Sequence, residues 1–279
     1  MTKISSLSEE RAPKPSASAK RRASLRKHEH FTSQFLEHDR TLIVYLPLGY
    51  EVRQDVRYPV LYLQDGQNLF DSATAFAGNE WGADETADEL ILARQIEPLI
   101  IVGVYNTGEY RIEEYTPSRD PKRGGGKADL YGRMLVEEIK PFVDGNYRTL
   151  QGPLNTGLGG SSLGGLVTLY LGIKYSEIFG KLAVLSPSVW WDNRAILDLI
   201  AELRPKPRLK IWLDMGTCEG GMSLQDTERL RDVLEAKGWV EGDDLQYSEI
   251  EGAMHNEAAW ATRVGPLLRF LFPPAPDSA

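Results

Sequence analysis

A short glycine-rich stretch near the middle of the chain holds the residue best placed to do chemistry. Gly160-Ser161-Ser162-Leu163-Gly164 fits the pattern G-x-S-x-G with Ser162 at its centre, whereas a register on Ser161 puts Leu163 where the pattern needs a glycine. In a nucleophile elbow, this serine occupies a strained turn between a strand and a helix, and the glycines let those elements pass close together. The same letters suit a plain flexible turn, but the strand and helix predicted on either side favour an elbow.

A serine hydroxyl needs a base to become a good nucleophile, and histidine is the usual one. The chain has four histidines, of which His28, His30 and His38 lie near its N-terminus. Only His255 follows the serine, between the last predicted strand and the last predicted helix. The α/β-hydrolases carry their catalytic residues in the order serine, acid, histidine, so His255 is the candidate base.

The acid that orients the base should lie between Ser162 and His255, in a loop after a strand. Asp214, Glu219 and Asp226 compete for this role. Asp226 also fits a capping box that starts at Ser223, and Asp214 continues a strand, which would point its side chain into the cover of the sheet. Glu219 precedes two glycines in a post-strand loop. We favour Glu219, and spacing alone leaves Asp214 as an alternative.

An oxyanion hole for this chemistry needs two backbone N–H groups. The first should come from Leu163, the residue after the nucleophile. The second should come from Gly66 or Gln67, in the turn that follows the strand predicted over residues 58–63. Without the serine, Asp65-Gly66 would be interpreted as a plain turn.

Two further features are candidates for substrate contact. Trp190 and Trp191 follow a predicted strand, where they either contact an apolar group of the substrate or pack into the fold. Arg111 belongs to a charge cluster typical of an ion-paired surface, within a polar loop over residues 106–127. Because this loop follows a strand and holds three consecutive glycines, we expect it to be mobile and to act as a lid.

Strands and helices alternate along the chain, and several strands are short continuous apolar runs. This pattern predicts an α/β-hydrolase fold, with a mostly parallel central sheet, helices on both faces and an antiparallel N-terminal edge. Strands are expected as a pair within residues 31–47 and over 58–63, 99–104, 155–161, 181–185, 209–214 and 245–250. Helices are expected over residues 83–95, 128–143, 163–175, 193–203, 223–237 and 256–271.

Composition narrows the class of protein. The 279 residues have a net charge of -8, but residues 1–27 are basic, so we expect a disordered tail over 1–27 and a single acidic domain over 28–279. An acidic domain argues against nucleic acid as a partner. The single cysteine, Cys218, excludes an internal disulfide and is expected to be inert. No run is long enough to cross a membrane, and we expect a cytoplasmic protein.

Together these motifs resemble the esterase family of the α/β-hydrolase superfamily, which includes esterase D-like proteins, enterochelin esterases and feruloyl or acetyl xylan esterase domains. The matching pieces keep the family's order within residues 28–272: residues 61–70, Arg111 with Glu114-Tyr115, 160–165, 186–191, 216–219, and His255 with Trp260. The resemblance implies Ser162 as nucleophile, His255 as base and Glu219 at the acid position, with no metal or organic cofactor. Asp65-Gly66 replaces the His-Gly of other branches, which favours the siderophore-esterase side.

The predicted function is a serine-dependent carboxylic-ester hydrolase that acts on a small-molecule ester through an acyl-enzyme, with a siderophore trilactone or an aryl ester as the favoured substrate. An acyltransferase of the same fold is a second prediction, although the related mycolyltransferases are exported. A non-catalytic binding protein is a third, but such proteins typically lose the serine or the histidine. The sequence leaves the natural ester and the oligomeric state open.

Overall fold

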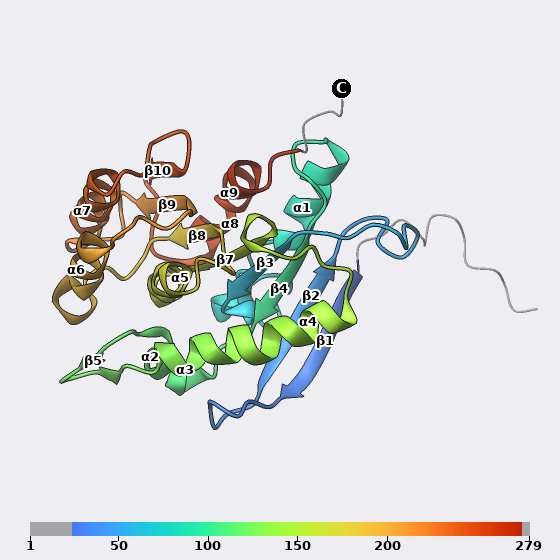
Figure 1. Cartoon of the computed structure of the whole chain (residues 1–279), viewed down its shortest axis with the longest axis horizontal. Coiled ribbons are helices and arrows are strands. Elements are labelled where there is room, and N and C mark those ends of the chain that lie inside the picture. The colour runs from blue at the N-terminus through green and yellow to red at the C-terminus, as the bar shows by residue number, and fades with distance from the viewer. Residues whose placement is uncertain (1–23, 275–279) are drawn as a thin grey trace, which may run out of the picture.

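The computed structural model describes residues 24–274, which form an eight-stranded sheet with helices on both faces (Figure 1). The strand order is β1-β2-β4-β3-β7-β8-β9-β10. β2 is antiparallel to both of its neighbours, and all later pairs are parallel. The strands are β1 (Ser24–Phe31), β2 (Arg40–Leu46), β3 (Val60–Gln64), β4 (Ile100–Val104), β7 (Thr156–Ser161), β8 (Lys181–Leu185), β9 (Lys210–Gly216) and β10 (Leu245–Ile250).

The central strands are buried along their whole length. Every residue of β3, β4 and β7 is buried, because parallel strands connected by helices are covered on both faces. Successive side chains alternate between two hydrophobic clusters, so that Ile100 and Val102 pack on one face and Ile101 on the other. The continuous apolar runs in the sequence follow from this double cover.

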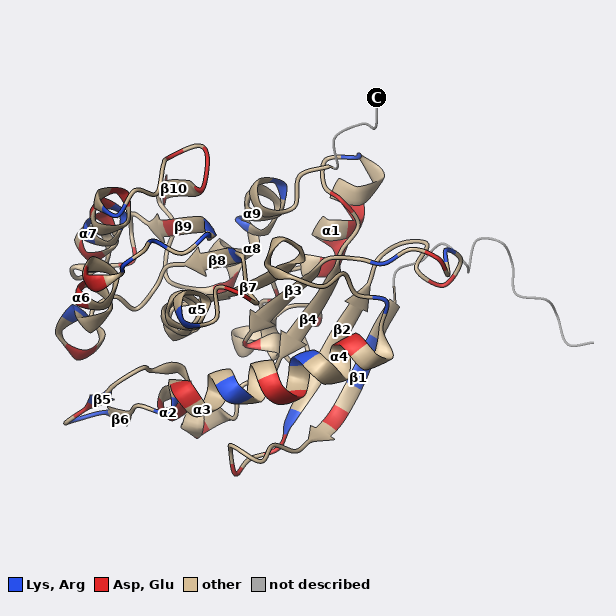
Figure 2. Cartoon of the chain, in the orientation of Figure 1, with Lys and Arg blue, Asp and Glu red and all other residues tan. Residues whose placement is uncertain are grey.

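Helices cover the two faces unequally. Side chains from α3 to α7 pack into the larger cluster, and side chains from α1, α8 and α9 pack into the smaller one. Figure 2 shows that charged residues lie along the outer surfaces of these helices, as expected for amphipathic helices. The helices are α1 (Ala83–Leu92), α2 (Arg111–Tyr115), α3 (Ala128–Arg133), α4 (Lys140–Asn146), α5 (Leu163–Lys174), α6 (Ala195–Glu202), α7 (Ser223–Ala236), α8 (Glu257–Ala261) and α9 (Val264–Leu271).

The predicted fold class and the order of its elements are confirmed, including the antiparallel N-terminal edge. The predicted boundary of the tail needs correction, because β1 begins at Ser24 and residues 24–27 therefore belong to the sheet. Arg26 and Lys27 pair with β2 although their side chains stay exposed. An edge strand can form through backbone hydrogen bonds without burying charged side chains, which a composition argument overlooks. The rest of the predicted tail lies outside the described residues.

Three local predictions also change. The 106–127 segment is partly regular, since it contains α2 and a small hairpin of β5 (Arg119–Asp120) and β6 (Gly124–Gly125). The helix expected over 128–143 runs from α3 to α4 through a turn of π-helix at Met134–Ile139. The single helix expected over 256–271 is broken at Thr262 and Arg263 into α8 and α9. Within residues 24–274, no helix is long and apolar enough to cross a membrane.

Candidate active site

Ser162 lies on the turn between β7 and α5 in a strained backbone conformation. Its φ of 60° and ψ of -122° are rare for a residue with a side chain. The neighbouring glycines allow the tight crossing. A Cβ on Gly160 would lie 3.0 Å from the carbonyl carbon of Gly164, and one on Gly165 would lie 2.8 Å from the carbonyl oxygen of Leu185. This is the geometry of a nucleophile elbow.

Ser162, His255 and Glu219 form a continuous hydrogen-bonded chain. The hydroxyl of Ser162 lies 2.9 Å from His255 Nε2, and His255 Nδ1 lies 2.6 Å from Glu219 Oε2. Since a carboxylate only accepts hydrogen bonds, Nδ1 carries the proton and Nε2 is free to accept one from the serine. The three residues follow β7, β9 and β10, whose carboxyl ends meet at one edge of the sheet.

The carboxyl group of Glu219 is held more firmly than its loop position suggests. Its side chain is only 1% exposed. Oε1 accepts hydrogen bonds from the Ser186 hydroxyl at 2.5 Å and from the Gly216 N–H at 2.7 Å. Burial alone would raise the pKa of Glu219, but the hydrogen bonds from His255, Ser186 and Gly216 hold it below its ordinary value. The carboxylate is therefore ionised at neutral pH.

Asp214, the alternative acid, points away from the histidine. It is fully buried, where Oδ1 accepts a hydrogen bond from Arg263 Nη1 at 2.6 Å and Oδ2 accepts one from Trp212 Nε1 at 2.7 Å. Burial raises the pKa of Asp214 to about 6 against the opposing attraction of Arg263. As the strand period indicates, its side chain lies in the cover of the sheet.

Asp226 does not cap α7, so this part of the prediction is wrong. The N-cap residue of α7 is Met222, and no side chain caps the helix there. Ser223 is already the first helical residue. Asp226 is 2% exposed, and its Oδ1 instead accepts a hydrogen bond from Arg194 Nε at 2.6 Å. A serine followed three residues later by an acid also occurs inside a first turn, where the acid is free to pair elsewhere.

Two clefts meet at Ser162 and His255. The first has a volume of about 550 Å³ and a wall of polar side chains together with the aromatic rings of Phe76 and Trp260. The second has a volume of about 440 Å³ and a wall that mixes polar with aliphatic and aromatic side chains. Residues of the first wall include Asp65, Gln67, Asn68, Asn106, Arg111 and Glu257. Residues of the second wall include Ile112, Arg123, Leu163, Ser188, Trp190 and Trp191.

Arg111 reaches the first cleft, but it is already paired. Its Nε and Nη2 atoms donate to the two carboxylate oxygens of Asp65, each at 2.7 Å. Asn106 Nδ2 donates to the same carboxylate at 2.7 Å. The side chain of Arg111 is 24% exposed, so it forms part of the cleft wall while its charge is balanced by Asp65. The ion-paired interpretation therefore describes Arg111 better than that of a free substrate-binding cation.

Trp190 and Trp191 differ in their exposure and in their contacts. Trp191 is 2% exposed, and its Nε1 donates to the carbonyl of Ser118 at 3.0 Å, so it packs and anchors the hairpin of β5 and β6. Trp190 is 41% exposed at the second cleft, with the guanidinium of Arg123 5.2 Å from its ring centre. Of the pair, Trp190 is the one available to a ligand. The hairpin is held against Trp191, and its role as a lid stays a prediction.

The three residues predicted to supply N–H groups to the oxyanion hole differ in their surroundings. Leu163 and Gln67 line the second and the first cleft respectively. Gly66 instead packs against β4, because a Cβ at this position would lie 2.5 Å from the carbonyl carbon of Gly103. The turn begins at Asp65, which has a left-handed backbone with φ of 54°.

Among residues 24–274, no cluster of His, Cys, Asp and Glu is arranged to hold a metal.

Comparison with known proteins identifies the family. The model of the family described as "Putative esterase" matches residues 33–270, which is most of the chain. The chain belongs to this family. It is therefore an ester hydrolase of the α/β-hydrolase fold.

Relatives of this esterase differ in length. The uncharacterized protein YjcH of Bacillus subtilis is 29% identical over 86% of this chain and 94% of its own length. An endo-1,4-beta-xylanase/feruloyl esterase of Xylanibacter ruminicola is 30% identical over 83% of this chain, which spans only 29% of that protein. The structure of the enterobactin esterase from Shigella flexneri has a TM-score of 0.72 at 20% identity, over 89% of this chain and 58% of that one.

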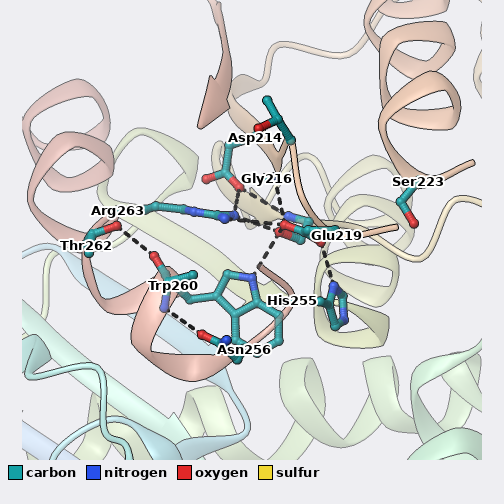
Figure 3. Close-up of polar contacts among 12 residues, drawn as sticks. Asp214, Gly216, Glu219, Ser223, His255, Asn256, Trp260, Thr262 and Arg263 are labelled. Carbon is teal, nitrogen blue, oxygen red and sulfur yellow. Dashed lines mark hydrogen bonds and ion pairs between the residues drawn. The ribbon is translucent and has the colours of Figure 1, made fainter. Parts of the chain in front are cut away.

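The sequence did not single out two polar residues beside Glu219. Ser186 follows β8 with a φ of 41°, and its hydroxyl contacts Glu219. Arg263 is 1% exposed and contacts Ser186. It also contacts Asp214 and Glu219 (Figure 3). The motif around Ser186 was visible in the family resemblance, but the contacts depend on the break between α8 and α9. No sequence pattern pointed to Arg263.

Proposed function

We propose that this esterase hydrolyses carboxylic esters through an acyl-enzyme on Ser162, with His255 as base and Glu219 as the residue that orients the base. The observation that carries the proposal is the chain of hydrogen bonds at 2.9 and 2.6 Å that joins these side chains from three separate loops. A nucleophile, a base within reach of it and an acid behind the base are the elements that acyl transfer by a hydroxyl requires.

In the acylation step, Ser162 Oγ attacks the ester carbonyl carbon as its proton moves to His255 Nε2. The carbonyl oxygen becomes an oxyanion, and the imidazolium is stabilised by the Glu219 carboxylate at Nδ1. When the tetrahedral intermediate collapses, the bond to the alcohol oxygen breaks and the alcohol takes the proton from Nε2. Water then repeats the sequence on the acyl-enzyme, releasing the acid and restoring Ser162.

Two backbone N–H groups stabilise the oxyanion in this proposal. Leu163 supplies one, at the start of α5, where the N-terminus of a helix favours negative charge. Gln67 supplies the other in preference to Gly66, since Gln67 lines the cleft next to Ser162 whereas Gly66 packs on β4. Removal of one such donor typically costs about 10²–10³-fold in kcat.

The two clefts support an aromatic ester as substrate. Relatives and structural neighbours are named for feruloyl esters and enterobactin, both of which carry aromatic groups. The exposed ring of Trp190 offers a stacking surface in the second cleft. The first cleft also has aromatic side chains, Phe76 and Trp260, but they stand among amide and carboxylate groups that suit a polar portion. We therefore assign the aryl group to the second cleft and the polar portion to the first.

A fluorophosphonate probe tests the nucleophile directly. We expect stoichiometric labelling of wild-type protein at Ser162, established by peptide mapping, and no labelling of Ser162→Ala. A hydrolysis screen over alkyl acetates, aryl esters and a catechol-bearing trilactone should show the highest kcat/KM for an aromatic member. Folded wild-type protein that neither reacts with the probe nor hydrolyses any ester would contradict the proposal. The cytoplasmic location and the absence of a nucleic-acid partner stay predictions from composition.

A further inference from the structure

The two oxygens of the Glu219 carboxylate have different surroundings. Oε2 faces His255 Nδ1 at 2.6 Å. Oε1 accepts from three donors, the first of which is the Ser186 hydroxyl at 2.5 Å. The other two are the Gly216 N–H at 2.7 Å and Arg263 Nη2 at 3.3 Å (Figure 3). One oxygen is therefore anchored, and the other is left for the histidine.

Ser186 is the centre of this anchor, and its hydroxyl is fully used. A serine hydroxyl has one proton to donate and two lone pairs to accept with. The proton goes to Glu219 Oε1, because a carboxylate only accepts, and the lone pairs receive Trp260 Nε1 at 3.0 Å and Arg263 Nη1 at 2.7 Å. Ser186 adopts the left-handed region with a φ of 41°, a strained conformation that often marks functional sites.

Arg263 connects the anchor to the sheet. Its Nη1 also donates to Asp214 Oδ1 at 2.6 Å, and the Ser186 N–H donates to the same oxygen at 3.2 Å. The side chains of Arg263 and Asp214 are 1% and 0% exposed. Asp214, on β9, thus fixes the position of the Arg263 guanidinium. The guanidinium in turn fixes the side chains of Ser186 and Glu219.

The charges of Asp214, Arg263 and Glu219 suit the proposed reaction. A buried arginine beside Glu219 would by itself cancel the negative charge that an imidazolium at His255 needs. Asp214 pairs with the same guanidinium, so the cluster of Asp214, Arg263 and Glu219 keeps one net negative charge when both carboxylates are ionised. The anchor therefore holds Glu219 in place without neutralising it.

We propose that Ser186, Arg263 and Asp214 are positioning residues, which hold Oε1 of Glu219 so that Oε2 stays directed at His255 during turnover. The need for them follows from the loop, since Glu219 precedes Gly220 and Gly221, both at positive φ, and a glutamate side chain has three rotatable bonds. This inference rests on the proposed role of Glu219. It concerns how the acid is held rather than whether Ser162 is the nucleophile.

The test compares Arg263→Lys and Ser186→Ala with Arg40→Lys as a matched control. Arg40 has a side chain that is 0% exposed and pairs with one carboxylate, Glu114, outside both clefts. Lysine keeps the charge of Arg263 but cannot span three acceptors, and Ser186→Ala removes a single hydroxyl. Each variant is assayed for kcat, KM, the thermal midpoint and the downfield proton resonance of His255 Nδ1–H, which reports on its hydrogen bond to Glu219.

We expect Arg263→Lys and Ser186→Ala to lower kcat about 10–100-fold, as displaced catalytic groups do, with KM changed by less than about three-fold. The downfield resonance should move upfield or broaden in both. Arg40→Lys should lose thermal stability with kcat and the resonance unchanged. If the two site variants keep kcat and the resonance while only their midpoints fall, they are structural and the inference is wrong. If Arg263→Lys does not fold, Ser186→Ala decides alone.

The two proposals fail in different ways. Absence of fluorophosphonate labelling in folded wild-type protein would remove Ser162 as nucleophile, whatever the anchor does. Normal labelling of wild type together with an unchanged resonance and an unchanged kcat in Ser186→Ala would remove only the anchor. The resonance is measured without substrate, so its outcome does not depend on which ester the enzyme prefers.

Discussion

Replacement of Glu219 by glutamine should invert the tautomer of His255. Glutamine places one carbonyl oxygen and one NH₂ group where glutamate has two acceptors. Three donors converge on the Oε1 position, so the carbonyl oxygen belongs there and the NH₂ group must face His255 Nδ1. Nδ1 then has to accept, which leaves the proton on Nε2 and pointing at Ser162. The serine can no longer give up its proton to this nitrogen.

The expected loss is large because the base is blocked rather than merely loosened. Wrong-tautomer variants of this kind lose roughly 10⁴-fold in kcat, which corresponds to about 5.5 kcal/mol of transition-state stabilisation. The assay is kcat on an activated aryl acetate, with the thermal midpoint measured alongside. Asp226→Asn is the control, because it removes the negative charge from a buried ion pair with Arg194 that lies outside the hydrogen-bonded chain, and should cost about 2 kcal/mol of stability with kcat unchanged.

Asp214→Asn separates the two candidate acids. We expect a smaller loss than for Glu219→Gln, on the order of 10–100-fold in kcat, since Asp214 acts only through Arg263. If Asp214→Asn abolishes activity while Glu219→Gln keeps more than about a hundredth of it, the assignment of the acid is wrong. In that case the three donors around Glu219 Oε1 do not determine the tautomer of His255.

Four further predictions concern the nucleophile, the second cleft, the first strand and the effect of low pH. Ser162→Ala and His255→Ala should each lower kcat about 10⁴–10⁶-fold, and the double variant should lose little more, because the residues act as a unit. Trp190→Ala should raise KM for aryl esters about ten-fold and leave KM for alkyl acetates within about two-fold, whereas equal effects would exclude a role in selectivity. Removal of residues 1–23 should leave the thermal midpoint and kcat unchanged, and removal of residues 1–31 should lower the midpoint by deleting β1. Because the pKa of Glu219 lies below its ordinary value of 4.5, its carboxylate contributes stability that is lost as the pH falls below that value. The difference in thermal midpoint between wild type and Glu219→Gln should therefore narrow there, and a constant difference would contradict this account.

Local patterns predicted the fold and the elbow well for a physical reason. Glycines around Ser162 are required because the strand and the helix of the elbow pass close to each other and to β8, so the spacing of the glycines reveals the turn. Buried parallel strands must be apolar on both faces, so their runs stand out in the sequence. His255 followed from chain order, and Glu219 from its place in a loop after a strand. These residues lie together because parallel strands end at the same edge of the sheet.

Predictions failed where distant contacts decide the outcome. Arg263 lies in a stretch with helical periodicity, and only the break before α9 brings its guanidinium to Glu219. Asp226 matched a helix-start pattern, but its partner is Arg194, from the segment before α6. Residues 24–27 have the composition of a solvated tail, and only the pairing partner β2 makes them a strand. In each case the sequence of the segment is compatible with two structures, and a remote residue selects between them.

The backbone of Ser162 also limits which other nucleophile this scaffold can acquire. At φ of 60° and ψ of -122°, a β-branched side chain is crowded by its own backbone, so threonine is excluded although it carries the same hydroxyl. Cysteine is unbranched and fits the same angles. Among side chains that attack through a hydroxyl or a thiol, a change of nucleophile at this turn is therefore confined to the exchange of serine for cysteine, and with it of an alkoxide for a thiolate that forms much closer to neutral pH.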